Sequence, residues 1–130
     1  MNENAIAREI VDAAFRIHTT LGPGLLESVY ETVLSYELTR RGLQVSRQQA
    51  TPVVYENVRM DEGFRADLIV EDKVIVEIKS VEALGYIHKK QLLTYLRLAD
   101  KRLGLLINFN MALIKEGITR IVNGLEEKSN

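Results

Sequence analysis

Two stretches near the start of the chain repeat apolar residues at helical spacing. In the first, residues 5–20, these are Ile6, Ile10, Ala13, Ala14 and Ile17. The spacing predicts an amphipathic helix, which ends at the turn-forming residues 21–24. A second helix is predicted over residues 26–41, with Gly42 as its C-terminal cap. Its apolar stripe consists of Leu26, Val29, Tyr30, Val33, Leu34 and Leu38.

The middle of the chain changes to short runs that are typical of β-strands. Strands are predicted over residues 43–47 and 51–55, where Pro52 indicates a sheet edge or a bulge. The polar residues 57–63 are predicted to form a loop. Residues 64–70 and 74–79 then read as a hairpin, with Glu71, Asp72 and Lys73 between its strands.

The last third of the chain predicts one helix and two strands. The helix covers residues 86–101, and the apolar run 103–108 indicates a buried central strand. Residues 117–122 are predicted to be a final strand, with a short helix as the alternative, and residues 128–130 to be a frayed tail. The predicted order is ααββββαββ. We therefore expect residues 1–130 to form one α/β domain, a mixed sheet flanked by helices.

Composition narrows the possible functions. The chain has no cysteine, which excludes disulfides, thiolate catalysis and cysteine-bound zinc and is compatible with a reducing cytoplasm. The N-terminus lacks a signal-peptide pattern, and no apolar run reaches the roughly 20 residues that span a bilayer. The net charge of −1 argues against a protein that coats nucleic acid. An enzyme that holds nucleic acid locally remains compatible with it.

Candidate chemistry lies in the predicted hairpin. Because side chains alternate along a strand, Glu77 and Lys79 point to the same side. A three-residue loop places Val70 opposite Val74, and Asp67 then lies opposite Glu77. A two-residue turn would instead send the two acids to opposite faces of the sheet. We expect the first register, or an equivalent one produced by a bulge.

Two such carboxylates need a partner of opposite charge. At about 4 Å they repel by roughly 4 kcal/mol at an effective dielectric constant near 20. Mg²⁺ is commonly held by one or two carboxylates together with water and phosphate oxygens, and it can acidify a water and neutralise charge on a phosphate. Lys79 would then orient the attacking water or stabilise developing charge. The alternative is a solvent-facing strand with a simple Glu–Lys pair.

Three motifs resemble a known family in their order along the chain. Asp67 followed by Glu77-Ile78-Lys79 resembles the PD-(D/E)XK nuclease signature, although Ala66 stands where that signature has proline. Residues 24–30 resemble the Gly-x-x-Glu-x-x-Tyr motif of the GxxExxY branch. Residues 91–95 resemble the Gln-x-x-x-Tyr motif of RecB-type members. The resemblance covers about residues 6–125.

This resemblance implies a restriction-endonuclease-like fold and a role for each motif residue. Asp67, Glu77 and the backbone carbonyl of Ile78 would bind Mg²⁺ or Mn²⁺, with Glu27 as an additional carboxylate ligand. Lys79 would be the catalytic lysine. The residues expected to orient substrate or active-site groups are Gln91 and Tyr95.

Simpler interpretations of the same residues remain open. Glu27 can be a first-turn acid that the helix dipole stabilises, Tyr95 a core residue and Gln91 a polar group facing the sheet. His88 shares a face of the third helix with Gln91 and Tyr95, and it is interpreted as a neighbour of the site. His18 is interpreted as a structural residue. The third helix has a basic side that either contacts phosphates or is simply solvated. This side consists of Lys89, Lys90, Arg97, Lys101 and Arg102.

Three functions compete. The first is a metal-dependent phosphodiesterase that acts on DNA, or less readily on RNA. The second is a non-catalytic binding or assembly module with the same fold. A small-molecule enzyme is disfavoured because the chain has neither a phosphate-binding glycine loop nor a Ser-His-Asp arrangement. By resemblance to restriction-type enzymes, a homodimer is also expected.

Overall fold

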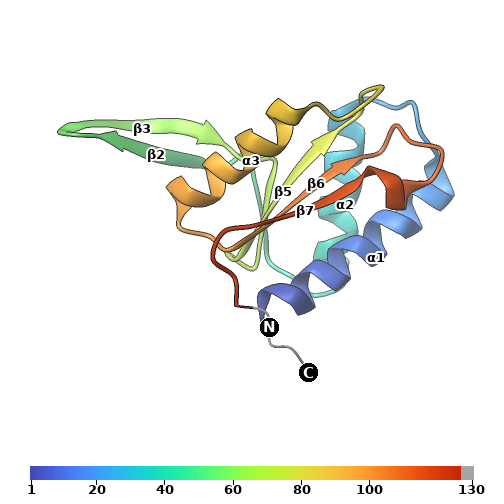
Figure 1. Cartoon of the computed structure of the whole chain (residues 1–130). Helices are drawn as coiled ribbons and strands as arrows, with labels where there is room; N and C mark the ends of the chain where they lie inside the picture. Colours follow the sequence, from blue (N-terminus) through green and yellow to red (C-terminus); the bar gives the residue numbers. More distant parts are fainter. Residues whose placement is uncertain (127–130) are drawn as a thin grey trace.

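Three layers make up the part of the chain that the computed structural model describes, residues 1–126 (Figure 1). Two helices lie on one face of a mixed sheet and the third helix lies on the other. The helices are α1 (Glu3–Leu21), α2 (Glu27–Arg40), α3 (Tyr86–Ala99) and the short 3₁₀ helix η1 (Ile114–Gly117). The strands are β1 (Val45–Arg47), β2 (Ala50–Tyr55), β3 (Val58–Arg65), β4 (Leu68–Val70), β5 (Val74–Lys79), β6 (Leu103–Asn108) and β7 (Ile118–Val122). The predicted tail at 128–130 lies outside the described residues.

The main sheet has five strands in the order β1-β4-β5-β6-β7. β5 and β6 are parallel and α3 connects them, whereas the other three neighbouring pairs are antiparallel. β2 and β3 form a separate two-stranded sheet. This hairpin, called the arm below, extends away from the rest of the molecule (Figure 1). The expected mixed sheet flanked by helices is therefore confirmed.

Alternation along β5 divides the core into two clusters. Val74, Val76 and Ile78 pack toward α1 and α2, while Ile75 packs toward α3 with Leu92 and Leu96. Gly104 in β6 permits the close approach of α3, because a Cβ there would lie 2.9 Å from a Leu92 methyl carbon. The apolar stripe predicted for α1 is buried throughout.

Predicted and observed boundaries agree closely for the regular elements. α1 and α2 begin and end within two residues of the prediction, α3 ends two residues early, and β5 and β6 match it fully. The turn after α1 has Gly22 and Gly24 at positive φ, and Gly42 follows α2 at φ 89°. The final segment is a strand, and η1 precedes it. Pro52 lies at a bulge of a two-stranded sheet, as its position indicated.

The largest error concerns residues 57–63, which were predicted to form a loop. They belong mostly to β3, so five strands rather than four separate α2 from α3. β3 escaped prediction because all its residues except Phe64 are exposed, which removes the burial that produces a regular polar–apolar alternation. The expected continuous strand 64–70 is also wrong, since it breaks at Ala66 and Asp67. Its two parts join different sheets.

Two predictions about buried faces are wrong as well. Leu26 and Val29, part of the apolar stripe predicted for α2, are exposed by 74% and 37%. Leu26 is the N-cap rather than a residue of the helix, and α2 buries only its Tyr30, Leu34 and Leu38 side. In the predicted continuous strand 64–70, alternation of side chains would put Ala66 on the same face as Leu68. Because the strand breaks after Arg65, Ala66 instead packs with the cluster under α3.

Candidate active site

The register of the β4–β5 hairpin brings Asp67 and Glu77 together. Val70 pairs with Val74 and Leu68 with Val76, as the three-residue loop predicted. Asp67 directly precedes β4, and its backbone N–H donates to Glu77 Oε2 at 3.1 Å. Its own carboxylate Oδ2 accepts from the Ile78 N–H at 2.7 Å. The two acids therefore lie close together, next to Ile78, whose backbone carbonyl was predicted to bind the metal.

Burial disfavours the negative charge of this carboxylate pair. Glu77 is only 6% exposed. Its pKa is raised to about 9, first by burial and then by its hydrogen bond to Asp67 and the charge of Asp67, while Lys79 acts weakly in the opposite direction. Near neutral pH a proton on Glu77 thus offsets part of the negative charge that the two carboxyl groups would otherwise share.

Lys79 ends β5 and is half-buried. Its backbone carbonyl accepts from the Phe109 N–H at 2.9 Å, which fixes the end of the strand. Within residues 1–126 its ammonium group forms no hydrogen bond or ion pair. Its charge nevertheless acts on Glu77. The ammonium group is therefore near the acids and available to a ligand.

Glu27 lies beside the carboxyl end of β5. Its Oε2 accepts from the Ser80 N–H at 3.2 Å, and Ser80 Oγ donates to the Leu25 carbonyl at 2.7 Å. A surface pocket opens here, lined by Glu27 and Ser80 but not by Asp67 or Glu77. In residues 1–126, no three His, Cys, Asp or Glu side chains are grouped so that they could hold a metal. The role of Glu27 as a third ligand therefore stays a prediction.

Tyr30 explains part of the spacing of the glycine–glutamate–tyrosine motif. It is fully buried and stacks on Phe109 with ring centroids 4.4 Å apart. Its hydroxyl donates to the Gly22 carbonyl at 2.6 Å and accepts from the Leu25 N–H at 3.2 Å. Tyr30 thus ties the turn before α2 to the core, and this turn places Glu27 next to β5.

The residues predicted on α3 differ in their surroundings. Tyr95 is half-buried and stacks on Phe64 with centroids 4.1 Å apart. Burial raises its pKa, and the charges of Glu77 and Asp67 add to the effect. The Tyr95 hydroxyl is therefore close enough to the two acids to interact with their charge. Gln91 is exposed, and no group in the described part of the chain hydrogen-bonds its amide.

The two histidines are occupied by structural contacts. His88 Nδ1 accepts from the Gly85 N–H at 3.0 Å, at the start of α3. His18 Nε2 lies 2.7 Å from the Met111 carbonyl and joins α1 to the loop before η1. These contacts give His18 the structural role that was expected and place His88 at the start of α3.

Sequence analysis missed the residues that hold Asp67 from its other side. Gln48 Nε2 donates to Asp67 Oδ1 at 3.0 Å and to Glu31 Oε1 at 2.7 Å. Its backbone N–H donates to the Asp67 carbonyl at 3.1 Å. Arg47 in turn donates to Glu31 Oε2 at 3.1 Å. A positive φ of 50° at Gln48 was not foreseeable from a lone glutamine between two strands.

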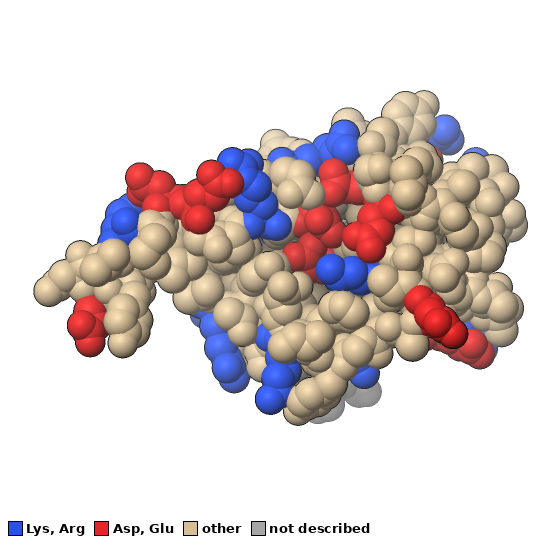
Figure 2. Space-filling model, turned by 90° about the horizontal axis from the view of Figure 1, so that it is seen from above, with Lys and Arg blue, Asp and Glu red and all other residues tan. Residues whose placement is uncertain are grey.

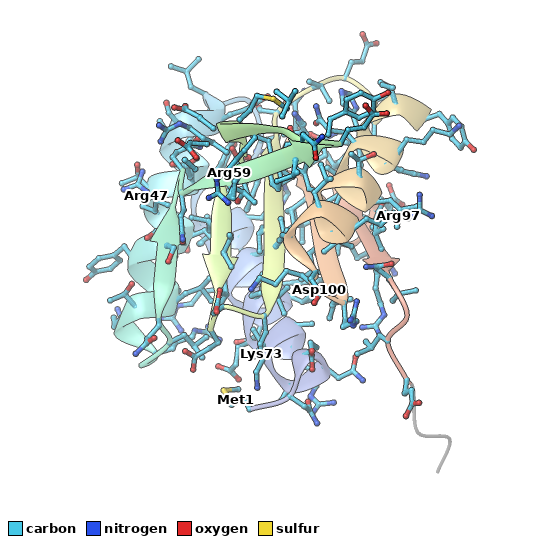
Figure 3. The ribbon with its side chains drawn as sticks, turned by 90° about the vertical axis from the view of Figure 1, so that its left-hand side faces the viewer. Met1, Arg47, Arg59, Lys73, Arg97 and Asp100 are labelled. Atoms are coloured by element: carbon cyan, nitrogen blue, oxygen red, sulfur yellow. The ribbon has the colours of Figure 1, made fainter. Side chains whose placement is uncertain are left out.

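The surface around the site combines acidic and basic groups. Figure 2 shows acidic side chains gathered in a hollow of the face seen from above, with basic atoms beside them. On α3, Arg97 projects outward (Figure 3). Part of the predicted basic side is already paired, because Lys101 contacts Asp72 at 2.8 Å and Arg102 contacts Asp100 at 2.9 Å. Its contact with phosphates stays a prediction.

The donor chemistry fits a small divalent cation. Asp67 and Glu77 supply hard oxygen ligands, and a backbone carbonyl, water and phosphate oxygens can complete such a shell. Burial, and then the hydrogen bond and charge of Asp67, raise the pKa of Glu77, so the charged form of the pair would be favoured by a bound cation. A cation would take the place of the proton that now offsets the repulsion. The residues therefore suit Mg²⁺ or Mn²⁺ better than a metal that prefers sulfur or several imidazoles.

Fold and site together define a restriction-endonuclease-like α/β domain with a carboxylate pair and a lysine at one end of its central strand. The family model of the PD-(D/E)XK nuclease superfamily matches residues 4–121. The chain belongs to this superfamily, whose nucleases generally use divalent metal ions.

Neither a curated protein nor a solved structure matches the chain. No helix within residues 1–126 is both long and apolar enough to cross a membrane. The GxxExxY branch, the homodimer and the cytoplasmic location stay predictions.

Proposed function

We propose that the protein is a metal-dependent nuclease that hydrolyses phosphodiester bonds of DNA, with RNA as the second choice. The observation that carries the proposal is the convergence of Asp67 and Glu77 beside Lys79 at the end of β5. Membership of the nuclease superfamily supports a nucleic-acid substrate. The motif of residues 24–30 supports placement in the GxxExxY branch.

In this proposal Asp67, Glu77 and the Ile78 carbonyl hold Mg²⁺ or Mn²⁺. The bound cation would lower the pKa of a water and neutralise charge on the scissile phosphate. Asp67 is kept in place by the Ile78 N–H and by Gln48, so its carboxylate does not have to be oriented when a ligand arrives.

Lys79 supplies a positive charge next to the acids. Its ammonium group has no partner within residues 1–126, so it can orient the attacking water or stabilise charge that develops on the phosphate. Tyr95 lies within reach of the field of the acids and orients groups at the site. We assign Gln91 to substrate contact, because its amide is exposed and uncommitted. Glu27 would supply an additional carboxylate ligand for the cation.

The decisive experiment compares nuclease activity with Mn²⁺ binding. Wild-type protein should cleave DNA with Mg²⁺ or Mn²⁺. Lys79→Ala should lower the cleavage rate about 100-fold, because it loses a group that stabilises charge in the transition state, while it still binds Mn²⁺. Lys73→Ala is the matched control, because Lys73 lies in the turn at the opposite end of β5. Circular dichroism should show that both variants remain folded.

Two results would count against this proposal. Wild-type protein that binds Mn²⁺ but cleaves neither DNA nor RNA would point to the non-catalytic binding module. Cleavage that is equally fast in wild type and Lys79→Ala would show that the chemistry takes place elsewhere or comes from a contaminant.

A further inference from the structure

The function proposed above makes no use of the pocket beside Glu27. This pocket has a volume of about 540 Å³, and its lining consists of residues 24–28 at the start of α2, Ser80 after β5 and Asn110 after β6. Sites for small ligands commonly have volumes of about 300–1,000 Å³. The pocket is therefore large enough for a group of the size of a nucleobase, and the chemistry of its lining decides which group fits.

Contacts of two buried side chains hold the walls of this pocket. On one side Tyr30 is fully buried, and its hydroxyl accepts from the Leu25 N–H at 3.2 Å. On the other side Asn108 is fully buried, and its Oδ1 accepts from the N–H groups of Val81 and Asn110 at 3.1 Å each. Both walls are thus fixed before a ligand arrives, as is usual for ligand pockets.

The charge of the lining disfavours a phosphate in the pocket. Glu27 contributes a carboxylate, and the described residues that line the pocket include no lysine or arginine. A phosphate inside the pocket would be repelled by this carboxylate without a nearby cation of the lining to compensate. We therefore expect a neutral occupant.

The rest of the lining combines apolar surface with free hydrogen-bonding groups. Leu25 and Leu26 are 38% and 74% exposed. Within residues 1–126 the Ser28 hydroxyl and the Asn110 Oδ1 atom have no hydrogen-bond partner, and Asn110 Nδ2 donates only to the Val81 carbonyl, at 3.3 Å. A nucleobase has two apolar faces and an edge of donors and acceptors, with which an asparagine amide can pair. It matches both properties of this lining.

The pocket adjoins the candidate active site through Ser80. Ser80 directly follows Lys79, and its N–H donates to Glu27 Oε2 at 3.2 Å. Consecutive Cα atoms lie about 3.8 Å apart. The pocket therefore begins one residue beyond the lysine that is proposed to act on the scissile phosphate, within reach of the base of a neighbouring nucleotide.

We propose that this pocket binds one unpaired nucleobase, that of the nucleotide next to the scissile phosphate. A base inside a duplex is paired and stacked, so it has to leave the helix before such a pocket can receive it. Single strands and strand ends meet this condition at the lowest cost. The place of the nucleotide next to the scissile phosphate rests on the proposed nuclease function, whereas the binding of a base does not.

Amide NMR titration of the full chain in EDTA tests the pocket without metal or catalysis. The probes are the four deoxynucleosides, and deoxyribose 5-phosphate is the control because it carries the charge without the base. At least one nucleoside should shift the amide signals of residues 24–28, 80 and 110, with a dissociation constant of about 1–10 mM. No such shift with any nucleoside at about 10 mM, or equal shifts with the control, would overturn the proposal.

Two substitutions locate the bound base. Ser28→Tyr places a ring in the pocket and should weaken nucleoside binding about tenfold or more, whereas Thr39→Tyr adds the same ring at the exposed far end of α2 and should leave binding unchanged. Asn110→Ala should weaken it about fivefold, because hydrogen bonds to the edge of the base are lost. Equal affinities of Ser28→Tyr and Thr39→Tyr would show that the base binds elsewhere.

Cleavage assays test the role of the pocket in the proposed nuclease. With Mn²⁺, a single-stranded oligonucleotide should be cleaved about tenfold faster than the same sequence in a duplex, and Ser28→Tyr should reduce this preference. Equal rates on both substrates would refute the place of the base next to the scissile phosphate. Nucleoside shifts without any cleavage would count against the nuclease alone, and cleavage without nucleoside shifts would count against the base pocket alone.

Discussion

Replacing Glu77 by glutamine should stabilise the metal-free protein near neutral pH. Glutamine reproduces the shape of a protonated glutamate. Its oxygen can accept the Asp67 N–H, as Glu77 Oε2 does at 3.1 Å, and its amide can donate to the Asp67 carboxylate. The substitution therefore removes a titration while it keeps the packing and the hydrogen bonds of the folded state.

The magnitude follows from the difference between the pKa of Glu77 in the unfolded and in the folded chain. Its pKa rises from 4.5 to about 9 on folding. Between these values the folded protein holds a proton that the unfolded chain has released, so the free energy of unfolding falls by about 1.4 kcal/mol per pH unit as pH rises. At pH 7 the loss amounts to roughly 3 kcal/mol, whereas below pH 4.5 it vanishes. Glutamine does not titrate, so the free energy of unfolding of the variant does not fall with pH for this reason.

Urea unfolding with EDTA, at several pH values between 4.5 and 8, measures the effect. Subtracting wild type from Glu77→Gln cancels the titrations that the two proteins share. The difference should grow with pH and reach a few kcal/mol at pH 7. Glu56→Gln, at an exposed turn of the arm, should show no such trend. A difference that is flat with pH, or a variant less stable than wild type at pH 7, would refute the assigned burial and coupling of Glu77.

Added metal should remove most of this difference in stability between the two proteins. If Glu77 is a ligand, Mn²⁺ at 100 times its dissociation constant stabilises wild type by about 2.7 kcal/mol. Glu77→Gln should gain much less, because a neutral amide replaces a charged ligand. An equal gain in both proteins would place the metal elsewhere.

Three further changes test the surroundings of the site. Gln48→Ala should weaken Mn²⁺ binding about tenfold in a titration, because the Asp67 carboxylate loses one of its fixed donors, and wild-type affinity would show that Gln48 has no positioning role. Tyr30→Phe should lower the free energy of unfolding by about 1–3 kcal/mol in urea, since two hydrogen bonds to the turn before α2 are lost. Gly104→Ala should lower it by a similar amount in thermal unfolding, because the new methyl group meets Leu92; an unchanged midpoint would contradict the close packing of α3 on β6.

The acid pair could be predicted because its determinants are local. Two apolar runs flank a three-residue loop, so the register follows from counting once the turn is known. Burial on both faces made the runs of β5 and β6 easy to recognise, and the structure confirms their bounds. The helices were equally accessible, since a buried stripe repeats at fixed spacing along α1.

The arm and the support of Asp67 could not be predicted for the opposite reason. β3 is exposed along nearly all its length, so polar and charged residues prevail in it and the segment resembles a polar loop. Gln48 acts through contacts with residues 17 and 19 positions away in the sequence. No local pattern indicates such contacts. Leu26 was wrongly assigned to a buried stripe, because helical spacing alone does not distinguish a buried apolar residue from an exposed one at the helix end.

Asp67 lies where the arm joins the main sheet. The chain leaves the arm at Arg65 and enters the main sheet at Leu68, so Asp67 lies in the junction. Arg65, at the end of β3, donates to the Gln48 carbonyl at 2.7 Å, and Gln48, in the turn before β2, donates to Asp67. The base of the arm and the acid therefore share one hydrogen-bond network. Ala66, where the nuclease signature has proline, is fully buried under α3 and fixes the junction by packing. A substitution that loosens the base of the arm should therefore also disturb the orientation of Asp67, because both depend on the same short segment of the chain.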